Sequence, residues 1–304
     1  MAPTQANNYV RKRRLVGLYK SQAAKNIFFT SILTREIFVL VRTLSEEQHE
    51  THSSVVSQYD DYYDDSIVAW RDLGARYKAK NIIRVSGGKK YTNVLDCGAG
   101  DGSVLKYLDA GDFCQNLYAI EISSSGIEKI NSLGLTKLKE VKKFDGYSIP
   151  YPDNHFDLVY CTHVIEHVEH PRILLREIKR VSKSQIFEVP LDHVINVDKY
   201  YKQLHSFGHI NVFSPSTFRY LLKSEGFLIK HDFKTKVNKE ILSFDMYRNK
   251  KIKKTLITEI QLNVFLPLMN IVKRILWGRK RYGEFGFSAY TCLVEADGGL
   301  EIMF

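Results

Sequence analysis

Residues that can bind a ligand follow four short apolar runs in the first two thirds of the chain. These residues are Asp96, Glu121, Asp145 and the segment Cys161-Thr162-His163. Each apolar run reads as a buried strand, because it is short and bounded by turn residues. The carboxyl ends of parallel strands meet at one edge of a sheet, so we expect these side chains to line a common site.

Three glycines at alternate positions follow the first run, in the order Asp96-Cys97-Gly98-Ala99-Gly100-Asp101-Gly102. An apolar helical pattern begins directly afterwards, so the turn leads into a helix N-terminus with unpaired N–H groups. A dinucleotide site favours G-x-G-x-x-G, which brings the backbone onto a pyrophosphate. The acid that begins D-x-G-x-G-x-G suits the cationic end of a ligand instead, such as an amino group. Glu121 lies 19 residues after Gly102, the spacing at which a carboxylate binds ribose hydroxyls.

Histidines follow the fourth run and supply candidate acid–base groups. His163 comes just after the strand and is the best-placed general base. Glu166 and His167 follow at intervals of three and four residues. A helix beginning here would place all three on one face.

The elements that must position these residues alternate between strand and helix patterns. Strands are expected at 93–96, 116–122, 139–144, 155–161 and 184–189, with two closing strands at 227–235 and 287–295. Helices are expected at 103–110, 124–133, 171–181 and 216–225, with Ser123 or Ser124 as one N-cap and Pro215 at the start of another. The fold class is therefore α/β: a doubly wound, Rossmann-like sheet of seven mostly parallel strands with helices on both faces.

Two additions flank this pattern. Residues 1–80 are predicted as an N-terminal helical extension or lid, with helices at 27–44 and 66–80 and an acidic, tyrosine-rich stretch at 59–65. The α/β domain spans 81–304, and it includes a helical insertion at 236–286, before the last strand.

Composition limits the class of protein. The chain is 44% hydrophobic and 26% charged, as in an ordinary globular domain. Its four cysteines show no C-x-x-C spacing, so neither a disulfide framework nor a zinc cluster is expected. We expect no secretory signal and no membrane span, which favours a cytoplasmic protein. Association of this protein with a membrane surface through the insertion is the alternative.

The net charge of +10 is unevenly distributed along the chain, with basic clusters at 11–25, 248–254 and 273–281. The last two enclose apolar residues that recur at helical spacing, with Pro267 as the expected kink. A basic amphipathic segment predicts peripheral membrane contact through 250–281. A helix packed on the body of the protein, or on a second copy in a homodimer, is the alternative.

These motifs can now be compared with a known family. The segment 96–102 resembles motif I of the class I S-adenosylmethionine-dependent methyltransferases. Residues 144–159 resemble their D-x(3)-LP-(F/Y)-x-D-x-x-FD-x-V block, and 161–168 resemble the E-H segment of the broad small-molecule group. Residues 209–214 and 218–227 are similar to the signature near the end of that group. The resemblance covers about residues 90–230, in order and at the spacing of the family.

The resemblance implies a role for each matching residue. Asp96 would lie near the amino group of S-adenosylmethionine, Glu121 would bind the ribose hydroxyls, and Asp145 would bond the adenine amino group. The residues implied to bind the cofactor are Asp96, Gly98, Ala99, Gly100, Gly102, Glu121, Ile122, Asp145, Gly146, Cys161 and Thr162. The sulfonium methyl is already activated, so the protein mainly aligns the nucleophile and excludes water.

A second resemblance concerns the histidines. Plant small-RNA 2′-O-methyltransferases carry E-x-x-E-H and a later histidine that hold a divalent metal, and ubiquinone-biosynthesis O-methyltransferases share a related motif. His163, Glu166, His167 and His209 occupy the matching positions, with His163 in place of the first acid. Imidazoles with one carboxylate suit a transition metal better than magnesium. The same E-H segment also occurs in relatives without a known metal, where it fixes the loop.

The leading prediction is methyl transfer from S-adenosylmethionine to an oxygen or nitrogen nucleophile of a small molecule. The acceptor would be a sugar, a saccharide precursor or a lipid-linked compound, and His163, Glu166, His167 and His209 would be the catalytic residues. A metal-assisted RNA 2′-O-methyltransferase is the alternative, although the basic charge lies outside the core and no RNA-binding module is readable. A catalytically silent, cofactor-binding partner subunit is the second alternative.

Overall fold

The computed structural model describes residues 51, 68–192 and 197–296. The helix predicted over 27–44 and the acidic stretch 59–65 lie outside the described residues. Backbone contacts divide the chain into the units 1–49 and 50–304, and all described residues belong to the second.

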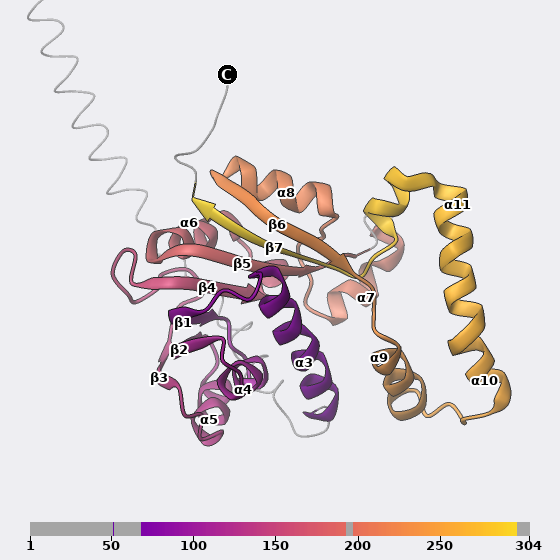
Figure 1. Cartoon of the computed structure of the whole chain (residues 1–304), viewed down its shortest axis with the longest axis horizontal. Coiled ribbons are helices and arrows are strands. Elements are labelled where there is room, and N and C mark those ends of the chain that lie inside the picture. Colours follow the sequence, from indigo (N-terminus) through magenta and orange to yellow (C-terminus); the bar gives the residue numbers. More distant parts are fainter. Residues whose placement is uncertain (1–50, 52–67, 193–196, 297–304) are drawn as a thin grey trace, which may run out of the picture. The chain divides into compact units, whose positions relative to one another are not determined.

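A seven-stranded sheet forms the framework of this unit, in the order β3-β2-β1-β4-β5-β7-β6 (Figure 1). Its strands are β1 (Tyr91–Cys97), β2 (Cys114–Glu121), β3 (Leu138–Lys143), β4 (Phe156–Thr162), β5 (Ser182–Pro190), β6 (Phe227–Thr235) and β7 (Ala289–Ala296). Strands β1 to β5 pair in parallel, and β7 runs antiparallel to both β5 and β6. The predicted doubly wound, mostly parallel sheet is confirmed.

The register brings the strand ends of the predicted site together. The chain builds β1, β2 and β3 in one direction and then returns to place β4 on the other side of β1, so the order reverses between β1 and β4. Asp96 of β1 pairs with Tyr160 of β4, and Thr162 of β4 pairs with Glu188 of β5. Such a switch point is where open α/β sheets bind their ligands.

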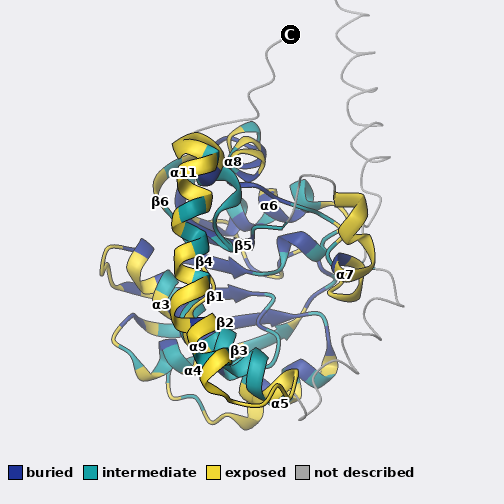
Figure 2. Ribbon diagram, turned by 90° about the vertical axis from the view of Figure 1, so that its right-hand side faces the viewer, coloured by how far each residue is buried: buried dark blue, intermediate teal, exposed yellow. Residues whose placement is uncertain are grey.

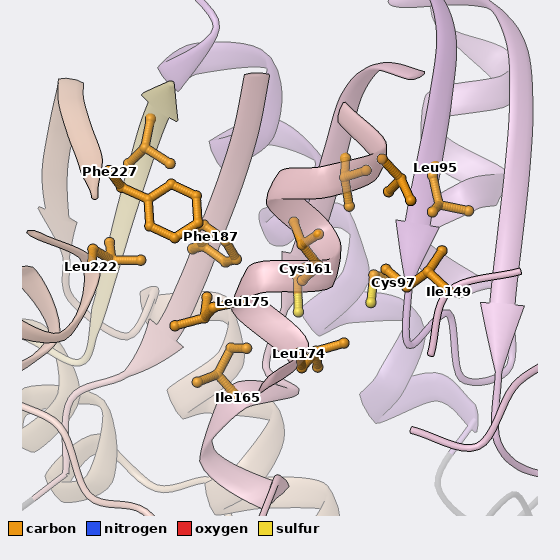
Figure 3. Close-up of a cluster of buried hydrophobic side chains, with 14 of the residues drawn as sticks. Leu95, Cys97, Ile149, Cys161, Ile165, Leu174, Leu175, Phe187, Leu222 and Phe227 are labelled. Carbon is orange, nitrogen blue, oxygen red and sulfur yellow. The ribbon is translucent and has the colours of Figure 1, made fainter. Parts of the chain in front are cut away.

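Helices cover both faces of the sheet (Figures 1 and 2). Helices α3 (Val68–Val85), α4 (Ser103–Ala110) and α5 (Ser124–Ser132) pack on one face, and α6 (Pro171–Val181) and α8 (Pro215–Ser224) pack on the other. Each face has its own hydrophobic cluster. Leu174 and Leu175 of α6 meet Cys161 and Phe187 in one of them (Figure 3). Because β1, β2, β4 and β5 are buried on both faces, they read as continuous apolar runs in the sequence.

Local sequence signals set the helix starts. The Ser123 hydroxyl accepts a hydrogen bond from the Gly126 N–H at 3.0 Å and caps α5. Ser214 and Thr217 form a reciprocal capping box at α8, where Pro215 occupies the first turn. The predicted caps are therefore confirmed, and they fix the helices that flank the ligand edge.

Two predictions about helices are wrong. Glu166 and His167 lie in the 3₁₀ turn η2 (Ile165–His167), and His163 precedes it in the left-handed region with φ +56°, so the three do not share a helical face. The helix predicted at 66–80 is present as α3, and only its predicted end is wrong, since the helix continues to Val85.

The insertion between β6 and β7 is helical, as predicted. It comprises α9 (Lys239–Phe244), the π-helical turn η4 (Asp245–Asn249), α10 (Leu256–Ile260), the π-helical turn η5 (Gln261–Phe265) and α11 (Leu266–Phe285). The predicted kink at Pro267 is wrong. Pro267 lies just after the π-helical turn η5, inside the continuous helix over Leu256–Phe285, and the non-helical backbone lies at Gly278 instead (φ 68°, ψ 170°).

Candidate functional site

The glycine turn after β1 requires glycine for both conformation and space. Gly98, Gly100 and Gly102 all have positive φ, at 81°, 59° and 76°. A Cβ on Gly98 would lie 2.5 Å from Cγ2 of Val164, in the loop after β4. The N–H groups of Gly98 and Ala99 both donate to the Ile120 carbonyl, at 3.0 and 3.1 Å. The turn is thus held between the ends of β2 and β4.

Asp96 is buried at the end of β1 and accepts a hydrogen bond of 2.7 Å from the Tyr160 hydroxyl. Burial raises the pKa of its carboxyl to about 8. The bond from Tyr160 and the charge of Lys78 act in the opposite direction, and the nearby Glu121 carboxylate adds to the rise. A cationic ligand group would favour the charged form, so Asp96 is suited to an ammonium group at this position.

Glu121 ties the end of β2 to the turn. Its Oε2 accepts from the Gly100 N–H at 2.8 Å, and its Oε1 accepts from the Ser123 N–H at 3.1 Å. Burial raises the pKa of this carboxyl, although these backbone hydrogen bonds oppose the rise. A carboxylate oxygen accepts two hydrogen bonds, so Glu121 has the capacity to hold both the turn and a pair of ligand hydroxyls.

Asp145 shapes the loop after β3. Its Oδ1 accepts from two backbone N–H groups of the following turn, at 2.7 and 2.6 Å. Its carbonyl accepts from both the N–H and the hydroxyl of Thr51, each at 2.9 Å. Gly146 has φ +95°, and a Cβ there would lie 2.0 Å from the Thr51 hydroxyl and 3.9 Å from Ile122. Ile122, Asp145 and Gly146 therefore lie side by side, and Thr51 is a neighbour that the sequence did not indicate.

The end of β4 supplies backbone rather than free side chains. Cys161 and Thr162 are both buried, and the Cys161 thiol belongs to the hydrophobic cluster that also contains Cys97. Burial raises the pKa of the Cys161 thiol, which makes it a poor nucleophile. The backbone of Cys161 and Thr162 could therefore line one side of a bound ligand.

His163 is held by Glu188 at the end of β5. Its N–H donates to the Glu188 carbonyl at 2.8 Å, and its Nε2 lies 3.3 Å from Glu188 Oε1. Its Nδ1 lies 3.6 Å from Oε1 of Glu166. The left-handed backbone thus points the imidazole between two buried carboxylates.

Glu188 is a site residue that sequence reasoning missed. Its Oε2 accepts from the Asn81 amide of α3 at 2.8 Å and from the Thr291 hydroxyl of β7 at 2.7 Å. Burial alone would raise its pKa, but His163, Thr291 and Asn81 together lower it below the usual value. The available signal was a carboxylate inside the apolar run Ile186-Phe187-Glu188-Val189.

Glu166, His167 and His209 form a compact cluster, with one ligand atom from each within 4.8 Å of the others. Glu166 is fully buried, and neither of its oxygens has a hydrogen-bond partner within the described part of the chain. His167 Nδ1 lies 2.9 Å from the Gly208 carbonyl, and His209 Nδ1 lies 3.0 Å from Asp192 Oδ2. Both acceptors place the proton on Nδ1, which leaves the lone pair of each ring on Nε2.

The electrostatics of the two rings differ. Burial lowers the pKa of His167, although the Glu166 charge opposes this. Burial also acts to lower the pKa of His209, but the hydrogen bond and the charge of Asp192 outweigh it and raise that pKa. His167 is consequently the more readily neutral of the two at physiological pH.

Lys78 of α3 is a further residue that sequence reasoning missed. Burial lowers its pKa, and the surrounding carboxylates of Glu188, Glu166, Asp96 and Asp101 oppose this. Lys78 was not predicted as a site residue, because the sequence pattern assigned residues 1–80 to an extension. Helix α3 therefore contributes both Lys78 and Asn81 to the site.

Comparison with known proteins identifies the family. The chain matches the family model of the methyltransferase domain over residues 69–231, which is more than half of its length. Ajmaline N-methyltransferase from Rauvolfia serpentina is 33% identical over 110 residues, covering 35% of this chain and 38% of that protein. A demethylmenaquinone methyltransferase from Listeria monocytogenes is 27% identical over 155 residues, covering 47% and 61%. The chain spans 38% to 61% of the length of the curated relatives that it matches.

Solved structures share the fold. Phosphoethanolamine N-methyltransferase 2 from Haemonchus contortus, in complex with S-adenosyl-L-methionine, aligns with a TM-score of 0.52 and 15% identity, covering 79% of this chain and 60% of that chain. A candidate sarcosine dimethylglycine methyltransferase from Galdieria sulphuraria aligns with a TM-score of 0.52 and 17% identity, covering 73% and 85%. At these identities the likeness concerns the fold alone. Together with the family match and the motifs at the strand ends, it places the chain among the class I, S-adenosylmethionine-dependent members of the methyltransferase domain family.

Proposed function

We propose that this protein transfers the methyl group of S-adenosylmethionine to an oxygen or nitrogen nucleophile of a small molecule. The observation that carries the proposal is the convergence of Asp96, Glu121 and Asp145 on adjacent strand ends around the glycine turn. S-adenosylmethionine carries an ammonium group, two ribose hydroxyls and an adenine amino group in the order in which Asp96, Glu121 and Asp145 follow one another across the sheet. The named relatives support a small-molecule acceptor, since one acts on ajmaline and another on demethylmenaquinone.

The reaction is an in-line displacement at the sulfonium methyl. The bond from carbon to the acceptor atom forms as the bond from carbon to sulfur breaks, and the sulfur keeps the electron pair. A hydroxyl acceptor must also lose its proton to a base, whereas a neutral amine loses its proton after transfer. The protein contributes alignment and the exclusion of water, which together lower the barrier without covalent chemistry.

The contacts of the histidines favour His167 over His163 as that base. Both ring nitrogens of His163 face a carboxylate, whereas His167 faces one only through Nε2, 3.7 Å from Glu166 Oε1, and its Nδ1 faces the Gly208 carbonyl. The lowered pKa of His167 favours a neutral ring, with the lone pair on Nε2. In this proposal His167 takes the role first predicted for His163, and His163 becomes a positioning residue.

The same cluster fits a divalent metal ion. The buried carboxylate of Glu166 has no hydrogen-bond donor among the described residues, and a cation would satisfy both oxygens. His167 and His209 would add Nε2 donors, with Gly208 and Asp192 orienting the rings from the other side. In this metal-bound form the lone pair of His167 would bind the ion, so His167 would act as a ligand in place of a base. Two imidazoles and one carboxylate suit zinc, cobalt, iron or manganese rather than calcium or magnesium. Such an ion would lower the pKa of an acceptor hydroxyl.

Methyl transfer is tested in two steps. Calorimetric titration should show that S-adenosylmethionine binds, that Glu121→Ala removes binding, and that the exposed Asp112→Asn control keeps it. A screen with radiolabelled cofactor should then transfer label to hydroxylated or amine-bearing small molecules. Cofactor binding without transfer to any acceptor class would favour a silent partner subunit, and label recovered in RNA would favour the RNA 2′-O-methyltransferase.

The metal is tested without relying on turnover. Protein exchanged into Co²⁺ should show visible absorption bands that differ from those of Co²⁺ in buffer, because the bands depend on the ligands and the geometry around the ion. His209→Ala should abolish the bands, and the matched control His205→Ala, on the exposed turn of α7 (Tyr201–Ser206), should keep them. If the spectrum of the wild-type protein equals that of Co²⁺ in buffer, the cluster has no metal role and Glu166 only fixes the loop.

A further inference from the structure

Within the described part of the chain, the hydrogen bonds between the helical insertion and the rest of the domain lie near the two ends of the insertion. We call residues 239–285 the arm. At its start, Glu240 accepts a hydrogen bond of 2.7 Å from the Tyr77 hydroxyl and pairs with Arg76, both on α3. At its end, the Gly283 carbonyl accepts from Lys234 Nζ at 2.9 Å, and the Glu284 carboxylate accepts from the Ser216 N–H at 3.1 Å.

Between these attachments the arm exposes a continuous apolar stripe. Its members recur at intervals of three or four residues and are Ile257, Ile260, Val264, Leu268, Ile271 and Ile275. Each of them exposes between 50% and 77% of its surface. Figure 2 shows α11 largely in the colour of exposed residues, in contrast to the mostly buried strands of the sheet. Single exposed apolar residues are ordinary, but a stripe that runs along a whole helix indicates a contact surface.

The exposed stripe is distinct from the side of the helix that packs against the protein. Leu262 is buried, and Leu266 and Met269 are half-buried, and these three belong to the opposite side of the same helix. The arm therefore has one apolar side packed within the protein and a second apolar side without cover among the described residues. A helix that is apolar on both sides needs two partners.

The charge of the arm identifies the second partner. Residues 248–281 contain ten lysine and arginine residues but only one acidic residue, whereas the whole chain has a net charge of +10. The single acid, Glu259, already accepts a hydrogen bond from Tyr247 and pairs with Lys254. Lys253, Arg279 and Lys280 are all exposed. Over the whole arm, eleven basic and four acidic residues leave a net charge of +7, so most of the excess positive charge of the chain lies on the arm.

We propose that the arm docks on the surface of an anionic lipid bilayer, with the stripe in the headgroup region and the basic residues on lipid phosphates. Apolar side chains between basic clusters are what such an interface takes up. A second copy of the chain would bring the same positive charge against the first, which disfavours it as cover. RNA would neutralise the charge but would leave the aliphatic stripe in water.

The arm is better suited to lie on a bilayer than to cross it. Among the described residues, the helix over Leu256–Phe285 is long and apolar enough to span a membrane by length and composition, with a mean hydropathy of 1.2. However, Lys273 and Arg274 interrupt its apolar part, and the backbone breaks at Gly278. Charges at that depth are costly in hydrocarbon, whereas at a bilayer surface they gain phosphate contacts.

Co-sedimentation with vesicles tests the docking in the absence of cofactor and acceptor, so its outcome does not depend on the proposed function. The full chain should sediment with vesicles of phosphatidylcholine and phosphatidylserine but not with phosphatidylcholine alone, and high salt should release it. The triple variant Ile260→Asp, Leu268→Asp, Ile271→Asp should bind about tenfold more weakly or worse. The control Tyr220→Asp, which changes an equally exposed residue of α8, should bind normally.

Folding and competing partners are controlled in the same experiment. Circular dichroism and cofactor titration should show that the triple variant is folded, and Lys253→Glu, Arg279→Glu, Lys280→Glu should lose binding by a second, electrostatic route. Wild-type protein that ignores anionic vesicles, or that stays bound through high salt and an alkaline wash, overturns surface docking. A stable dimer that the triple variant dissolves, or RNA binding that it loses, would overturn it in favour of those partners.

Discussion

The stability advantage of the variant Asp96→Asn over the wild-type protein should increase as the pH rises. Burial raises the pKa of Asp96 to about 8 from its ordinary value of 3.8. A carboxyl whose pKa is raised by folding stabilises the native state fully only below its unfolded pKa, and this stability is lost as the pH rises toward the folded pKa. From about pH 5 to about pH 7 the wild-type protein should therefore lose about 3 kcal/mol relative to the variant, at about 1.4 kcal/mol per pH unit. The amide oxygen that the substitution introduces still accepts from Tyr160, so packing is preserved.

The assay is urea unfolding of the cofactor-free protein at several pH values. The difference between variant and wild type isolates Asp96 from the other titrating groups, and Asp112→Asn, which changes an exposed carboxylate, should show no such trend. Binding of S-adenosylmethionine by the wild-type protein should release close to one proton near neutral pH, because an ammonium group favours the ionised carboxylate. Its affinity should rise about fivefold from about pH 7 to about pH 8. Parallel stability curves together with no proton release would refute the buried, protonated Asp96.

Three further substitutions test the framework of the site. Gly98→Ala should cost about 3 kcal/mol in urea unfolding, from its positive φ and the clash with Val164, and adding Val164→Ala should restore only the part due to the clash. Glu121→Gln should weaken cofactor binding about thirtyfold in calorimetry while the fold persists, since it loses a charged acceptor for the Gly100 N–H. Glu225→Gln should cost about 2 kcal/mol at neutral pH, because burial acts to raise the pKa of Glu225 but Arg172 and Arg176 of α6 outweigh it and lower that pKa. The loss should vanish as the pH falls through the lowered pKa, and a pH-independent loss would contradict the ion pairs.

The sheet was predictable because each strand carries its own signal. The runs around Val94, Leu117 and Leu158 are apolar on both faces, and the glycine turn and the capping serines mark where helices begin. The spacing of Asp96, Glu121 and Asp145 was equally readable, since each lies at the end of its strand or just after it. Local patterns of this kind can be interpreted from the sequence because they do not depend on contacts with distant segments.

The surroundings of His163 and His209 were not predictable, because residues from distant segments build them. Glu188 binds Asn81 from α3 and Thr291 from β7, and Asp192 orients His209 across a loop. No spacing rule connects residues that lie more than one hundred positions apart. Helix η2 illustrates the limit, since the pattern His163-Val164-Ile165-Glu166 is compatible with an α-helix and only the surrounding contacts select the shorter turn.

The left-handed backbone of His163 shows what those contacts achieve. A non-glycine residue in this region costs about 1 to 2 kcal/mol and persists only where its surroundings compensate. Here the N–H of His163 is bonded to the Glu188 carbonyl at 2.8 Å, and the imidazole lies between Glu188 and Glu166. The same conformation turns the chain back so that His167 meets His209 with ring centroids 5.0 Å apart. A relaxed helical residue at 163 would carry the chain away from β5 and separate the cluster, so the strain is the structural cost of bringing Glu166, His167 and His209 together.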